Sequence, residues 1–162
     1  MLTPTLLHFS PNASYQVCFT PQQNCTKLMV DHIKDAKKSI YVQSYSFTNY
    51  PIAKALYKAY KRGVDVKIIF DKSQFDPKHF SQSKYFLKKH IPIWIDNKPR
   101  IAHNKVMIID DTWVETGSFN FTYSAQKYNA ENMLWIKDKA LAKKYLKNWF
   151  YRKSKSVRRK HI

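Results

Sequence analysis

Residues 64–71 contain the strand-like run that most constrains the fold, because Ile68, Ile69 and Phe70 follow one another without a polar break. Successive side chains on a strand point to opposite faces, so consecutive apolar residues indicate burial on both faces of a sheet. The run therefore predicts a central strand covered from both sides. Gly63 stands directly before it, at the end of a helical pattern, and predicts a left-handed C-terminal cap.

Helical and strand patterns alternate around this run. Apolar residues recur at helical spacing over about 26–38 and again over about 52–62, and a β-rich segment at 39–47 lies between them. Strands that alternate with helices, followed by a hairpin, predict an α/β domain with a mixed β-sheet flanked by helices on both faces. The other expected elements are a loop at 72–83, a short helix to about 90, strands at 91–95, 104–110, 113–118 and 131–136, and a final helix from about 139.

The length of 162 residues suits one domain with a buried core. We expect an N-terminal extension at 1–15, the domain at 16–151 and a mobile basic tail at 152–162. Twenty-nine Lys and Arg against eleven Asp and Glu give a formal net charge of +18. Such an excess indicates a polyanionic partner, and the alternative is a lysine-rich surface that serves only solubility.

A histidine, a lysine, a hydroxyl and a carboxamide lie within eighteen residues of one another, at 103–120. Side chains two positions apart on an extended strand share a face, so His103 and Lys105 should point the same way. The same rule places Ser118 and Asn120 together on the next strand. An imidazole beside a fixed cation and neutral donors suits attack on a phosphodiester, because the donors can hold the phosphate while the imidazole reacts.

The spacing His-x-Lys-x4-Asp-x6-Gly-Ser resembles the signature of the phospholipase D superfamily, and residues 117–122 and 129–132 look most like its short bacterial Nuc-type endonucleases. The resemblance covers about residues 15–150. It implies a phospholipase D-like fold, no metal ion or other cofactor, and an active site built from two copies of the motif. The matching residues are His103, Lys105, Asp110, Gly117 and Ser118.

The resemblance also implies a role for each matching side chain. His103 would form a covalent phosphohistidine or protonate the leaving group. Glu131 would accept a hydrogen bond from this imidazole and orient it, which makes His103, Lys105 and Glu131 the catalytic set. Lys105, Ser118 and Asn120 would bind the phosphate.

Two motif residues are expected to have structural roles. Asp110 lies at odd spacing from His103 and Lys105, so it should face the other side of the strand and pair or cap there. Gly117 lacks a Cβ, which would let a phosphate approach the backbone. For Glu131, the alternative to a catalytic role is a surface glutamate at a strand end.

Cys18 and Cys25 are the only cysteines, too few for a zinc site without a suitable histidine pair. They form either a small-loop disulfide, which we favour, or two buried thiols. A disulfide implies an oxidising compartment, so we expect a periplasmic or secreted protein, with the cytoplasm as the alternative. The first residues do not resemble a signal peptide, which would then have been removed. No stretch approaches eighteen apolar residues, so we expect no transmembrane segment.

These observations predict a metal-independent phosphodiesterase that cleaves DNA, or RNA, with little sequence specificity. The scattered acidic residues cannot easily supply a two-metal site. One motif and no internal repeat predict a homodimer with the active site at its twofold interface. The alternatives are a hydrolase of an anionic phospholipid such as cardiolipin and a nucleic-acid-binding module with a degenerate site. The charge argues against the first alternative, and the intact motif argues against the second.

Overall fold

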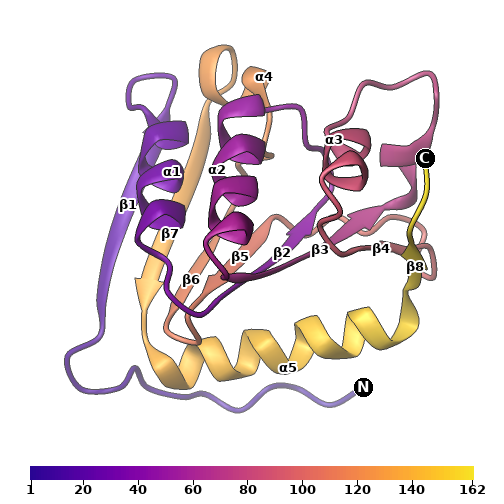
Figure 1. Cartoon of the computed structure of the whole chain (residues 1–162). Helices are drawn as coiled ribbons and strands as arrows, with labels where there is room; N and C mark the ends of the chain where they lie inside the picture. Colours follow the sequence, from indigo (N-terminus) through magenta and orange to yellow (C-terminus); the bar gives the residue numbers. More distant parts are fainter.

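The computed structural model describes residues 1–162 as one mixed sheet with helices on both faces (Figure 1), which confirms the predicted fold class. The helices are α1 (Cys25–Asp35), α2 (Tyr50–Lys61), α3 (Ser83–Lys88), α4 (Tyr123–Lys127) and α5 (Lys139–Lys155), with a 3-10 turn at Lys72–Phe75. The strands are β1 (Ser14–Thr20), β2 (Ser39–Ser44), β3 (Asp65–Asp71), β4 (Ile93–Asp96), β5 (Val106–Ile109), β6 (Trp113–Gly117), β7 (Glu131–Lys137) and β8 (Val157–Arg159). Their order across the sheet is β1-β7-β6-β5-β2-β3-β4-β8.

The apolar run at 64–71 is β3, which lies in the interior of the sheet, as predicted. It pairs in parallel with β2 and β4, whereas all other strand pairs are antiparallel. Ile68 and Phe70 belong to the larger core cluster, beneath α1 and α2, and Ile69 belongs to the smaller cluster, beneath α5. Consecutive apolar residues therefore serve opposite faces, which is the physical reason for the run.

Helices α1, α2 and α3 cover one face of the sheet, and α5 crosses the other (Figure 1). Trp149 anchors α5 by donating its indole N–H to the carbonyl of Val42, at 3.0 Å, in a buried position. Its ring also stacks on Tyr41, with centroids 4.7 Å apart. The long final helix is thus held against β2 by both packing and a hydrogen bond.

Gly63 ends α2 in the left-handed conformation expected for it, with φ of +96°. Its N–H donates to the carbonyl of Tyr60, and the N–H of Val64 donates to the carbonyl of Ala59, both at 3.1 Å. This pair of bonds is a Schellman motif, which satisfies carbonyls that a helix end leaves free. The motif turns the chain directly into β3.

Two edge strands, β1 and β8, were not predicted from the sequence. β1 begins at Ser14, inside the segment 1–15 that was expected to precede the domain, and it pairs with β7 along its whole length. The expected mobile tail at 152–162 is also partly ordered. Arg152–Lys155 form the last turn of α5, and Val157–Arg159 form β8, which pairs with β4.

Cys18 and Cys25 form a disulfide, with Cα atoms 5.7 Å apart, as favoured from the sequence. The bond connects β1 to the first residue of α1 and is buried. No helix is both long and apolar enough to cross a bilayer.

Candidate active site

The motif residues other than Asp110 gather at the end of the sheet where the parallel strands β2, β3 and β4 finish. Ligands of open α/β sheets commonly bind outside the carboxyl ends of such strands. The segment before β5 is held there by Asp71, the last residue of β3, whose carboxylate accepts the N–H of Ala102 at 2.7 Å. Asp71 is itself buried, so this hydrogen bond fixes the loop that carries the histidine.

His103 and Lys105 lie in the extended segment before β5, which begins at Val106. Their side chains meet, as expected: the Lys105 Nζ atom is 3.0 Å from the His103 Nδ1 atom and 3.0 Å from the His103 carbonyl oxygen. The Tyr45 ring lies beside the imidazole, with centroids 4.4 Å apart. His103 remains exposed to solvent, so a substrate can reach it.

Glu131 begins β7 beside this pair. Burial lowers the pKa of the Lys105 ammonium, and the negative charge of Glu131 partly offsets that effect. The Glu131 carboxylate accepts a hydrogen bond from the Asn129 amide at 3.0 Å, and no bond joins it to His103. The structure therefore places Glu131 near the cation, while its role in orienting the imidazole stays a prediction.

Ser118 and Asn120 follow β6 and share a side because the residues between and after them are core residues. Phe119 and Phe121 are both fully buried, which turns the alternate positions outward. The Ser118 hydroxyl is exposed and accepts the backbone N–H of Asn132 at 3.0 Å. The Asn120 Oδ1 atom is buried and has no hydrogen-bond partner in the single chain.

Gly117 has a structural role between two strands of the sheet. Its φ is +148°, and a Cβ built there would lie 2.4 Å from the carbonyl oxygen of Asn132. The missing side chain therefore allows β7 to approach β6, and the approach of a phosphate to this backbone stays a prediction. Asn132 was not predicted as a site residue, although it sits in the 129–132 stretch that carried the resemblance.

Asp110 lies at the opposite end of β5 from His103 and has a positive φ of 56°. Its carboxylate accepts the backbone N–H groups of Lys37, Lys38 and Ser39, at 2.9, 2.6 and 3.0 Å. These bonds fix the entry into β2. The spacing argument placed Asp110 behind the site, and these contacts give it the structural role expected there.

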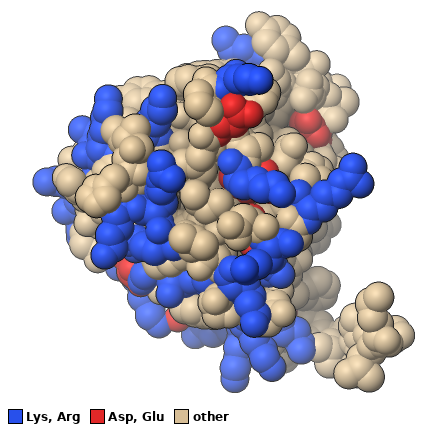
Figure 2. Space-filling model, turned by 90° about the vertical axis from the view of Figure 1, so that its right-hand side faces the viewer, with Lys and Arg blue, Asp and Glu red and all other residues tan.

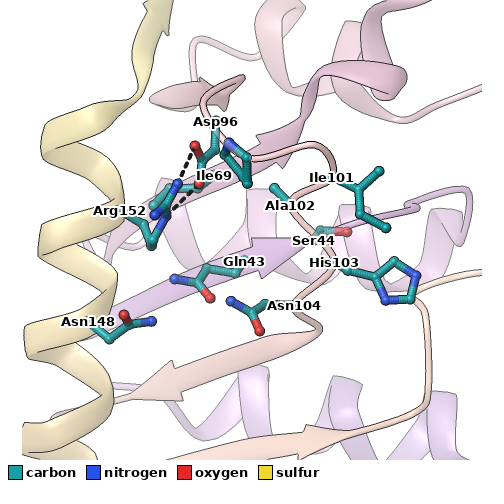
Figure 3. Close-up of a pocket in the computed structure, with 11 residues that line it drawn as sticks. Gln43, Ser44, Ile69, Asp96, Ile101, Ala102, His103, Asn104, Asn148 and Arg152 are labelled. Carbon is teal, nitrogen blue, oxygen red and sulfur yellow. Dashed lines mark hydrogen bonds and ion pairs between the residues drawn. The ribbon is translucent and has the colours of Figure 1, made fainter. Parts of the chain in front are cut away.

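A cavity of about 440 Å³ opens beside His103, between the loop before β5 and helix α5 (Figure 3). No pattern in the sequence predicts this cavity, because its residues come from four distant segments. Asp96 and Arg152 close one side with a bidentate ion pair, at 2.7 and 2.8 Å. No three His, Cys, Asp or Glu side chains converge closely enough to hold a metal ion.

Positive charge covers the face of the molecule formed by α3, β4 and β8. Figure 2 shows this face with many Lys and Arg side chains and few acidic ones. Lys153 and Arg158 both lie 4.7 Å from the centroid of the Trp94 ring. Part of the basic segment at 152–162 is thus ordered on an aromatic side chain.

Comparison with known proteins places these observations in a family. Residues 29–153 match the family model described as cardiolipin synthase, PLD-like domain. A phospholipase D of Rickettsia prowazekii is 48% identical over 144 residues, which are 89% of this chain and 70% of that protein. A mitochondrial cardiolipin hydrolase of Xenopus tropicalis is 29% identical over 110 residues, 68% of this chain and 52% of that protein.

Two solved structures are similar over almost their whole length. Nuc from Salmonella typhimurium, described as a phospholipase D family member, has a TM-score of 0.84 and 38% identity. The match covers 91% of this chain and 99% of Nuc. NucT from Helicobacter pylori has a TM-score of 0.81 and 26% identity, over 90% of this chain and 99% of NucT.

Proposed function

This chain belongs to the phospholipase D superfamily and is a phosphodiester hydrolase of that superfamily, and from this premise we propose that its substrate is nucleic acid. The observation that carries the proposal is the net charge of +18, with Lys and Arg spread over the face in Figure 2. Cationic surfaces bind nucleic acids by releasing counterions from the phosphate backbone. The likeness to Nuc and NucT supports the same choice.

In the proposed mechanism, an imidazole nitrogen of His103 attacks phosphorus while the bond to the leaving oxygen breaks. A second imidazole protonates that oxygen. The same group then takes a proton from water, which attacks the phosphohistidine, breaks the P–N bond and regenerates His103. Dividing one displacement into two lowers the barrier of each. Lys105, Ser118 and Asn120 stabilise the charge on the phosphoryl oxygens.

We propose that the second imidazole comes from a second copy of the chain in a twofold-symmetric homodimer. The single chain brings only one histidine to the site. Helix α5 packs against β2, β4, β5 and β6, and the same face of β1 stays uncovered. There Tyr15, Val17 and Phe19 are 71, 43 and 52% exposed. An apolar face that runs along β1 toward Glu131 supports an interface next to the site.

Hydrolysis of an anionic phospholipid is the second candidate function. It is favoured by the similarity to proteins named phospholipase D and mitochondrial cardiolipin hydrolase. A basic surface would also attract anionic membranes. The polar cavity beside His103 argues for nucleic acid, because few of its lining residues are hydrophobic and an acyl chain would gain little there.

The test is incubation of the purified protein with single-stranded DNA, duplex DNA, RNA and vesicles that contain cardiolipin, each with and without EDTA. We expect cleavage of nucleic acid that persists in EDTA, because the proposed chemistry uses side chains alone. His103→Ala should abolish turnover, and His8→Ala, at an exposed histidine outside the motif, should not. Cleavage of the vesicles alone would reject the nuclease proposal.

A further inference from the structure

The cavity beside His103 contains a buried polar side chain without a partner. Gln43, on β2, is 6% exposed, and its carboxamide makes no hydrogen bond within the protein. Its oxygen and nitrogen are open to the cavity rather than enclosed, so they are free to bond a ligand there. Gln43 and His103 line the same cavity, and the Gln43 carboxamide points toward Asn148 and Arg152, on the side of α5 (Figure 3).

Two further carboxamides line the same cavity, Asn104 from the loop before β5 and Asn148 from α5 (Figure 3). Neither makes a side-chain hydrogen bond within the protein. The guanidinium of Arg152, on the wall of the cavity, is already paired with Asp96, which is 3% exposed. The cavity thus presents several neutral donors and acceptors and one arginine whose charge is compensated.

This chemistry suits a planar, neutral group that carries both donors and acceptors on its edge. A phosphate would require an uncompensated cation, and none lines the cavity. An acyl chain would require an apolar wall, whereas Ile69 and Ile101 are the only large aliphatic side chains in the lining. A nucleobase has the required edge, and the aliphatic side chains can contact its faces.

We infer that this cavity binds the nucleobase next to the scissile phosphate. The inference rests on the proposed nuclease function and adds a base-binding subsite to it. A carboxamide can turn its oxygen and nitrogen ends about a soft terminal torsion, so the subsite can bond different bases in turn. The base must leave its stack to enter, which makes unpaired strands better substrates than duplexes.

The test uses an end-labelled single-stranded oligonucleotide that contains one abasic nucleotide. Cleavage at every other linkage in the same molecule serves as the internal reference. If the cavity binds the neighbouring base, cleavage at one linkage beside the abasic position should fall about tenfold or more, because several hydrogen bonds are lost together. Uniform cleavage through the abasic position would overturn the inference.

The double variant Gln43→Leu with Asn148→Ala gives an independent reading. Its cleavage of intact strands should decrease relative to its turnover of bis(p-nitrophenyl) phosphate, which has no base. The decrease in cleavage beside the abasic position should disappear, because this variant no longer binds the base. Asn97→Ala is the matched control, since Asn97 is an exposed carboxamide near the cavity that does not line it. If cleavage beside the abasic position decreases as much in the double variant as in the wild-type protein, the assignment of the subsite is wrong.

The same experiment separates the two proposals. If wild-type protein cleaves no nucleic acid but hydrolyses bis(p-nitrophenyl) phosphate or phospholipid, the nuclease proposal fails and the subsite fails with it. If it cleaves DNA evenly across the abasic position, the nuclease proposal stands and only the subsite is rejected.

Discussion

Glu131 lies in the expected part of the site but contacts other residues than the expected one. The sequence placed its carboxylate beside the imidazole, and the structure places it near Lys105 with Asn129 as its hydrogen-bond donor. Glu131 is the first residue of β7. The next residue, Asn132, donates its backbone N–H to the hydroxyl of Ser118. The single chain fixes the surroundings of this carboxylate, whereas in the proposed homodimer its partner during catalysis would depend on the substrate and on the second copy of the chain.

Glu131→Gln should therefore keep the fold and lose activity. The substitution removes the negative charge near Lys105 and leaves only a weaker, neutral acceptor for an imidazole N–H. By comparison with acids that orient catalytic histidines, we expect a decrease in kcat of roughly 10²- to 10⁴-fold. The measurement is kcat together with the melting temperature. A variant with normal kcat would leave Glu131 as a surface glutamate at a strand end.

Asp110→Asn should act mainly on stability. The carboxylate accepts three backbone N–H groups, and an amide can replace only part of this arrangement. We expect a loss of about 1–3 kcal/mol in the free energy of unfolding, with kcat for the folded protein little changed. Asp111→Asn, at the next position, is the control, because its half-exposed carboxylate pairs with Lys38 at the surface and such a pair contributes little to stability. A large decrease in kcat without destabilisation would assign Asp110 to catalysis.

Glu115 should make stability depend on pH. It is 0% exposed, both carboxylate oxygens lack partners, and burial raises its pKa well above the usual value. The folded protein then keeps the proton while the unfolded chain releases it, so stability should decrease as pH rises above the ordinary glutamate pKa, about 4.3. Glu115→Gln removes this penalty.

The melting temperature of Glu115→Gln relative to wild type should therefore increase between pH 4.5 and pH 8. Near the lower pH, both proteins carry an uncharged side chain at this position and should differ least. If this difference in melting temperature stays constant across the range, the pKa of Glu115 is the same in the folded and unfolded states, and the prediction is wrong.

At the scale of elements, the sequence predicts those strands and helices whose apolar pattern matches their burial. β3 and α2 are examples, because their apolar residues face the core and Gly63 marks the turn between them. In β1 the apolar pattern does not match the burial, so the strand was not predicted. Its apolar residues Tyr15, Val17 and Phe19 are exposed, and its inward side includes Gln16 and Thr20. β8 is exposed throughout and depends on backbone pairing with β4, which no local pattern reveals.

The cavity beside His103 could not be predicted for a related reason. Its carboxamides come from β2, the loop before β5 and α5, and only the packing of α5 across the sheet brings them together. The motif residues were easier to find because they lie close together in sequence. Local spacing therefore predicted which motif side chains lie together, and tertiary packing decided what surrounds them.

The disulfide between β1 and α1 should contribute measurably to stability. Closing so short a loop restricts the unfolded chain, and the loop-entropy relation gives roughly 2–3 kcal/mol. Reduction should therefore lower the melting temperature by several degrees. The double variant Cys18→Ala with Cys25→Ala is the control, since its melting temperature should not respond to reductant. If reductant lowers the melting temperature of both proteins equally, the decrease does not come from this disulfide.

For the whole molecule, the uncovered face of β1 is the feature that should decide assembly. Val17→Asp places a charge in the middle of this face and should shift the protein toward monomer, with activity that falls on dilution more steeply than for wild type. Val157→Asp is a matched control, because Val157 is an exposed valine on the opposite edge strand. Sedimentation equilibrium and specific activity measured over the same concentrations test this prediction.

A fully active monomer of Val17→Asp would contradict the need for two imidazoles in one active site. A dimer that persists with normal activity would move the interface to another surface. Loss of the dimer in both valine variants would indicate a general effect of the added charge, and it would remove the support for β1.

The sheet divides the interior into two cores of unequal size, with 28 buried residues on the side of α1 and α2 and seven on the side of α5. Because local unfolding follows the number of buried contacts, the α5 layer can open while the larger core stays intact. Amide protons of α5 should then exchange with solvent before those of β2 and β3. Because α5 forms one wall of the cavity, this wall would open and close on the timescale of the local unfolding. A ligand could then enter and leave through this layer without global unfolding.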